Sequence, residues 1–165
     1  MRIIGIDPGT AIIGYGIIDT VNGKNILVDY GVITTSPKRS PELRLLDLYV
    51  DLNGLLTEFK PDTAAMEKLF FNTNTTTGIG VAKACGVIQL CLVQRSLPVT
   101  EYTPIQVKQT VVGYGKAEKK QVQYMVPKLL GMKETPKPDD AADALAVAIT
   151  HSHNYKMNNL LYKLK

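Results

Sequence analysis

The chain has 165 residues, of which 45% are apolar, and this size and composition predict one domain with a substantial core and exclude a disordered protein. No apolar run approaches the ~18 residues that a membrane-spanning helix requires, and the start of the chain lacks a signal-peptide cleavage pattern, so we expect a cytoplasmic protein. The formal net charge is +4, and residues 105–137 hold seven lysines against two glutamates.

The first third of the chain is predicted to form strands. Residues 2–7, 12–18 and 26–34 are apolar runs separated by turn signals, of which Asn22-Gly23 is the strongest. Three strands joined by short turns make an antiparallel meander.

A helical period follows. A helix is expected from residue 41, with Ser40 as its cap, to about residue 60, and a fourth strand over 63–70. A second helix over 77–95 is rich in glycine and alanine, which suits close packing on the sheet or a subunit contact.

The last third is predicted to be mostly helical. Residues 99–102 form a fifth short strand, and helices follow at 104–109, 117–130 and 139–151. We therefore expect an α/β fold, a mixed five-stranded sheet of a three-strand antiparallel meander plus two parallel strands, flanked by helices. If the first and fourth strands are neighbours, Asp7 and Glu67 lie side by side.

Four carboxylates are the main candidates for chemistry: Asp7, Glu67, Asp140 and Asp143. Carboxylates repel when packed together, so a protein gathers them only around a shared cation. Because oxygen ligands dominate and no histidine or cysteine set matches, Mg²⁺ or Mn²⁺ is the expected ion. Asp140 and Asp143 project from one side of the last helix, although Asp139 is an alternative to Asp140.

Simpler explanations exist for each acid. Asp7 can cap the turn after its strand, and Glu67 can pair with Lys68.

The two cysteines, Cys85 and Cys91, lie six residues apart on one predicted helix and point in different directions, which argues against a disulfide or a zinc site. A basic flank beside an acidic centre suits a polyanion whose backbone approaches a metal, although lysines also serve solubility.

The chain resembles the RuvC-type Holliday-junction resolvases over nearly its whole length. The motifs are IGIDPGT at 4–10, Glu67 with Phe70-Phe71, QVKQTV at 106–111, AEK at 117–119 and DAADALA at 140–146. The resemblance implies an RNase H-like nuclease domain over 1–165. It also implies a homodimer that cuts opposed strands of a four-way DNA junction in recombination and in the repair of DNA damage, with a branch-migration helicase complex as a further partner.

The resemblance also assigns roles to individual residues. The four carboxylates match the family's metal ligands, and two Mg²⁺ ions per site, for which Mn²⁺ would substitute, imply hydrolysis that leaves 5′-phosphates. The expected DNA-binding residues are Phe70, Lys108 and Lys119, with Lys116 and Lys120 as additional candidates. Phe71 is the alternative to Phe70, because neighbours on a strand point to opposite faces.

Two points stay open. His151 and His153 could act as general bases, but histidines in a mobile tail are more often solvated. Cys85 stands where the family pattern suggests a polar residue, which leaves the dimer contact undefined.

Other functions are possible on the same residues. The hairpin at residues 5–10 also resembles the phosphate-binding turn of actin-like ATPases. A related nuclease acting on RNA and a junction-binding protein without catalysis are further alternatives.

Overall fold

The computed structural model describes residues 1–69 and 75–163, and side chains outside 75–77 and 156–163. Within these residues, five strands form one mixed sheet in the order β3-β2-β1-β4-β5. The strands are β1 (Arg2–Asp7), β2 (Ile12–Val21), β3 (Lys24–Thr34), β4 (Thr63–Glu67) and β5 (Val99–Tyr102). β1, β2 and β3 are antiparallel neighbours, and β4 and β5 run parallel to β1, which confirms the predicted sheet.

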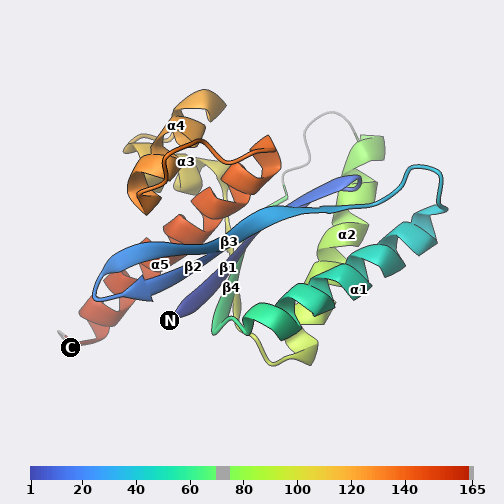
Figure 1. Ribbon diagram of the computed structural model, residues 1–165, viewed down its shortest axis with the longest axis horizontal. Helices are drawn as coiled ribbons and strands as arrows, with labels where there is room; N and C mark the ends of the chain where they lie inside the picture. Colours follow the sequence, from blue (N-terminus) through green and yellow to red (C-terminus); the bar gives the residue numbers. More distant parts are fainter. Residues whose placement is uncertain (70–74, 164–165) are drawn as a thin grey trace.

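Helices cover both faces of the sheet. They are α1 (Pro41–Phe59), α2 (Thr75–Gln94), α3 (Pro104–Val112), α4 (Lys119–Leu130) and α5 (Asp139–Lys163). In Figure 1, α1 and α2 lie on one side of the strands, and α3, α4 and α5 lie on the other. Each face has its own apolar core, one centred on α1 and α2 and the other on α5. None of the described helices is long and apolar enough to cross a bilayer.

The hairpin between β2 and β3 is formed as its sequence predicts. Asn22 and Gly23 both have positive φ, of 48° and 82°, as a two-residue turn between twisted strands requires. The strands it joins run beyond the predicted bounds, to Val21 and from Lys24.

Several predicted boundaries were wrong for local reasons. β4 ends at Glu67, and does not continue through residue 69, because both neighbouring strands end beside it: β1 at the Pro8 turn, and β5 where Thr103 caps α3. α3 continues past residue 109 until Gly113 ends it in a left-handed conformation. The predicted start of α1 is confirmed, with Ser40 as the N-cap residue, although its side chain makes no capping bond.

The last helix is longer than predicted, and His151 is not a solvated tail residue. His151 is buried, with Nε2 bonded to Thr63 Oγ1 at 3.0 Å and Nδ1 to Tyr102 OH at 3.0 Å. Ser152 is also buried and donates to Asn25 Oδ1 at 2.6 Å. These bonds hold the middle of α5 against β3, β4 and β5, and so they stabilise the helix beyond residue 151.

α5 lies directly on the backbone of β1 and β2 because glycines face it. A methyl group added at Gly5 would overlap the backbone of Ala144 and Ala148, and one added at Gly14 would overlap the carbonyl of Asp140. The absence of side chains at these positions therefore sets the height of α5, and its acidic first turn, above the sheet.

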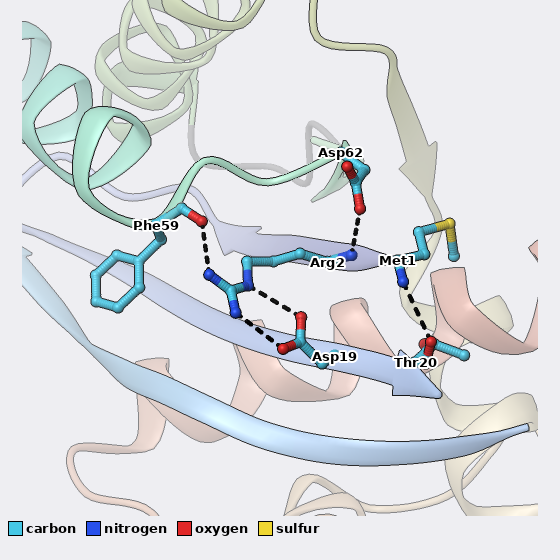
Figure 2. A network of polar contacts seen from close by, with 6 residues as sticks. All are labelled: Met1, Arg2, Asp19, Thr20, Phe59 and Asp62. Carbon is cyan, nitrogen blue, oxygen red and sulfur yellow. Dashed lines mark hydrogen bonds and ion pairs between the residues drawn. The ribbon is translucent and has the colours of Figure 1, made fainter. Parts of the chain in front are cut away.

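The amino end of β1 is held by a polar network, shown in Figure 2. The Arg2 guanidinium donates two bonds of 2.9 Å to the Asp19 carboxylate and one of 2.9 Å to the carbonyl of Phe59. The Arg2 backbone N–H donates to Asp62 Oδ2 at 2.6 Å. One residue thus joins β1 to β2, to the end of α1 and to the approach to β4, which fixes the register on which the other end of the sheet depends.

We predict that Gly5→Ala lowers the free energy of unfolding by about 1–3 kcal/mol or more, because the new methyl group overlaps the α5 backbone. Gly54→Ala is the matched control, since a methyl group there meets open space on α1 and removes a helix glycine, for a gain of up to about 1 kcal/mol. Urea denaturation followed by circular dichroism measures both. A Gly5→Ala protein as stable as the parent would show that α5 is free to shift.

Candidate active site

Asp7 and Glu67 lie side by side at the carboxyl edge of the sheet. β1 and β4 are parallel, and Ile6 pairs with Met66, so the next residue on each strand is an acid. This confirms the expectation that neighbouring parallel strands bring the two carboxylates together. Asp143, on the second turn of α5, faces the same place, and all three acids line one cavity of about 360 Å³.

The cavity also contains two lysines and apolar walls. Lys108 comes from α3 and Lys119 from the start of α4. The remaining lining residues are Pro104, Val107, Val122 and Ala146. A second cavity of about 260 Å³ shares Asp7 and Glu67 and extends toward α2, so the acids line two adjoining hollows.

The electrostatics of Asp7 are unfavourable to its charge. The pKa of Asp7 is raised to about 8, and burial is the largest cause. The negative charges of Glu67, Asp143 and Asp140, in that order, contribute to this rise, and the Lys119 ammonium opposes it. A carboxyl group at the end of a central strand therefore lacks the counter-charge that its ionised form needs.

The other two acids of the cavity show the same effect. Burial raises the pKa of Glu67, and Asp143 adds to the rise. Burial also raises the pKa of Asp143, although Lys119 opposes this through an ion pair of 2.6 Å between Nζ and Oδ2. Glu67 forms no ion pair with Lys68 in the described part of the chain, which removes the simpler explanation of that residue.

Asp140 and Asp139 occupy different positions at the start of α5. Asp140 is partly buried, and its charge contributes to the raised pKa of Asp7. Asp139 is exposed and does not act on Asp7, although its charge reaches Asp143 and Lys119. Neither residue lines the cavity with the other acids. The arrangement favours Asp140 over Asp139 as the fourth member of the cluster.

The remaining predicted site residues lie farther out or outside the described residues. Lys116 and Lys120 are exposed and do not line the cavity. Phe70 and Phe71 fall outside the described residues. His153 is exposed and lines a different hollow near the β2–β3 hairpin, away from the acids.

The donor set fits a hard divalent cation. The acids supply carboxylate oxygens, the ligands that Mg²⁺ and Mn²⁺ prefer. Within residues 1–69 and 75–163, no three acidic, histidine or cysteine side chains already stand in a ready-made ligand arrangement. The cluster consists of partly desolvated acids that line one cavity, and one of them, Asp143, is paired with the Lys119 ammonium. A cation bound between the acids would relieve their mutual repulsion.

Sequence reasoning missed two features that place the lysines. Thr103 and Gln106 form a reciprocal capping box at the start of α3, and at the start of α4 the Glu118 backbone N–H donates to Gln121 Oε1. The first matches the Thr-x-x-Gln pattern of such boxes and was readable from the sequence. The direct contact of Lys119 with Asp143 left no sequence signal.

Comparisons with known proteins point in one direction. A family model described as "Crossover junction endodeoxyribonuclease RuvC" matches residues 3–151. A protein of that name from Alkaliphilus metalliredigens is 52% identical over 165 residues, covering 100% of both chains. The Thermus thermophilus RuvC structure is 34% identical with a TM-score of 0.89, covering 96% of this chain and 97% of that one. The same protein in complex with a Holliday junction substrate is 32% identical with a TM-score of 0.87, covering 95% and 96%.

We predict that Asp7→Asn stabilises the metal-free protein. The folded pKa of Asp7 is raised to about 8, so between the unfolded value near 3.8 and pH 8 the folded state binds more protons, and stability falls as pH rises through this window. In EDTA, the melting temperature of the variant should exceed that of the parent most at pH 8–9 and match it near pH 4.

Asp51→Asn, an exposed acid on α1, is the control for the loss of one negative charge. A gain from Asp7→Asn that does not depend on pH, or one matched by Asp51→Asn, would contradict the assignment of strain to the buried cluster.

Proposed function

This chain belongs to the RuvC family of crossover junction endodeoxyribonucleases, and we propose that it cuts four-way DNA junctions by metal-dependent phosphodiester hydrolysis. The fold is RNase H-like, as in the RuvC structures it matches, and the family is one of metal-dependent nucleases. The observation that carries the proposal is the convergence of Asp7, Glu67 and Asp143 in one cavity beside two lysines.

We propose that Asp7, Glu67, Asp140 and Asp143 hold two Mg²⁺ ions, for which Mn²⁺ can substitute. Bound there, the ions would supply Lewis-acid activation of the attacking water and neutralise charge on the leaving 3′-oxygen. Asp7 follows the pairing of β1 with β4 and so neighbours Glu67, and its raised pKa has contributions from all three other acids, so bound cations would relieve its charge directly. The product would carry a 5′-phosphate.

The side chains around the acids position the substrate. Lys108 lines the cavity from α3 and can hold a phosphate next to the scissile bond, and Lys119 approaches from α4. Val107 and Val122 form an apolar wall that limits the water around the reacting phosphate. Exposed Lys116, in the turn before α4, and Lys120, in its first turn, extend the positive surface, where a DNA strand leaving the site would run.

We further propose a homodimer that joins through α2. Ile79, Leu90 and Val93 are 56%, 51% and 66% exposed, and they recur at helical spacing with Gly86, where an added methyl group would meet open space. An apolar helix face with a bare glycine suits a second helix packed closely against it. Cys85 is buried toward the sheet and so lies off this face. Symmetric cutting of two opposed strands requires two such sites.

Two wider proposals rest on the family alone. The domain would act as one nuclease unit over 1–165 in the cytoplasm, in DNA recombination and repair. A branch-migration helicase complex would be its partner at the junction.

We predict that Asp7→Asn abolishes cutting of a synthetic immobile junction in Mg²⁺ while leaving junction affinity within a few-fold, because the carboxylate holds metal and does not contact DNA directly. Gel-shift titration measures the affinity, and mapping of nick positions measures the cutting. The exposed Asp51→Asn variant should cut as the parent does. An equal loss of binding and cutting would instead assign Asp7 a structural role.

We predict that Lys119→Ala weakens binding to junction and duplex DNA alike and lowers the slope of log affinity against log salt by about 1, as expected for one lost phosphate contact. Fluorescence anisotropy over a salt series, with Ca²⁺ in place of Mg²⁺, gives this slope. Lys24→Ala, at the far hairpin, should leave it unchanged. If the Lys119 variant keeps the parent slope, the basic surface does not follow the DNA backbone.

A further inference from the structure

Lys119 makes the only ion pair of the acid cluster among the described side chains. Its Nζ lies 2.6 Å from Asp143 Oδ2, and the Asp143 side chain is only 18% exposed. The Lys119 side chain is itself 56% exposed, so its ammonium reaches inward to this acid from the rim of the cavity. The Lys119 side chain has room to extend into water, and its ammonium instead pairs with the largely buried Asp143 carboxylate.

The ammonium stands where the cluster needs positive charge. Asp7 and Glu67 have no ion-pair partner in the described part of the chain, and Asp143 has only Lys119. A divalent ion shared by these acids would use Asp143 oxygens as ligands, and an ammonium bonded to the same carboxylate competes for them.

The backbone of Lys119 is fixed while its side chain can move. Lys119 is the first residue of α4, and the bond from the Glu118 backbone N–H to Gln121 Oε1 spans it. Ala117 before it is buried, and α4 packs against α5 on the same face of the sheet. The long and largely exposed side chain can therefore swing away from Asp143 without disturbing the helix.

We propose that the Lys119 ammonium is a stand-in cation, which neutralises Asp143 in the metal-free protein, is displaced when a divalent ion binds, and is thereby released to hold a DNA phosphate. The inference rests on the proposed metal site. It makes metal and DNA binding mutually favourable, since the ion frees the lysine that the DNA uses and the DNA removes the competitor of the ion.

The test measures Mn²⁺ binding without DNA, by electron paramagnetic resonance of the free ion. Lys119→Met keeps the apolar stem and removes the ammonium, and it should bind Mn²⁺ about tenfold more tightly than the parent, because no charge-assisted hydrogen bond has to break first. Lys120→Met is the matched control, since it removes the same charge one residue away from an exposed side chain without an ion pair in the described chain. It should change the affinity little.

The outcomes separate the inference from the proposal beneath it. Saturable Mn²⁺ binding that Lys119→Met leaves unchanged or weakens, or that Lys120→Met strengthens equally, overturns the stand-in role and leaves the nuclease site intact. A parent protein that binds no Mn²⁺ overturns both. Mn²⁺ binding that is lost in Asp7→Asn is assigned to the acid cluster, and binding that remains is assigned to other parts of the protein.

A second measurement follows the lysine itself. In the parent protein without DNA, acetylation by acetic anhydride and mass spectrometry reports the reactivity of each lysine. Addition of Mg²⁺ should raise the labelling of Lys119 at least several-fold and leave Lys116 and Lys120 unchanged. Equal labelling of Lys119 with and without Mg²⁺ would show that the ion does not displace it.

Discussion

The main constraint on this structure is the repulsion among carboxylates that are buried together at one edge of the sheet. The pKa of Asp7 is raised to about 8, with burial as the largest cause and the charges of Glu67, Asp143 and Asp140 adding to it. Such an arrangement costs folding free energy and persists only because the rest of the molecule enforces it. Two backbone features do so: the parallel pairing of β1 with β4 and the seating of α5 on Gly5 and Gly14.

The two ends of the sheet therefore have opposite characters. The amino end is a structural anchor in which polar groups are paired: Arg2 bonds Asp19 and Phe59, and His151 bonds Thr63. Burial lowers the pKa of His151, so this end loses stability as pH falls below the ordinary histidine value near 6.5. The carboxyl end responds with the opposite sign, since protonation relieves its acids. The end with paired polar groups thus supports the end at which the acids repel one another and where the proposed chemistry takes place.

The sequence predicted the sheet and the adjacent acids because these follow from local rules. Buried apolar runs, the Asn22-Gly23 turn and the position of Asp7 after its strand are all readable within a few residues. The length of α5 was not readable, because it depends on bonds from His151 and Ser152 to distant strands. The different burial of Asp139 and Asp140 was likewise not readable, because it depends on how α5 lies on the sheet, where Gly14 of another strand contacts the Asp140 carbonyl.

The contact between Lys119 and Asp143 shows where sequence reasoning ends. A resemblance to a family can assign a lysine to DNA and an aspartate to metal, but it treats the two as separate functions. In the folded chain the α4 and α5 helix starts lie together, so the two side chains meet. If Asp143 holds metal and Lys119 holds DNA, as proposed, both ligands compete with the same ion pair, and the cost of breaking it is shared between them. On this proposal, the site binds a divalent cation most tightly when DNA is also bound.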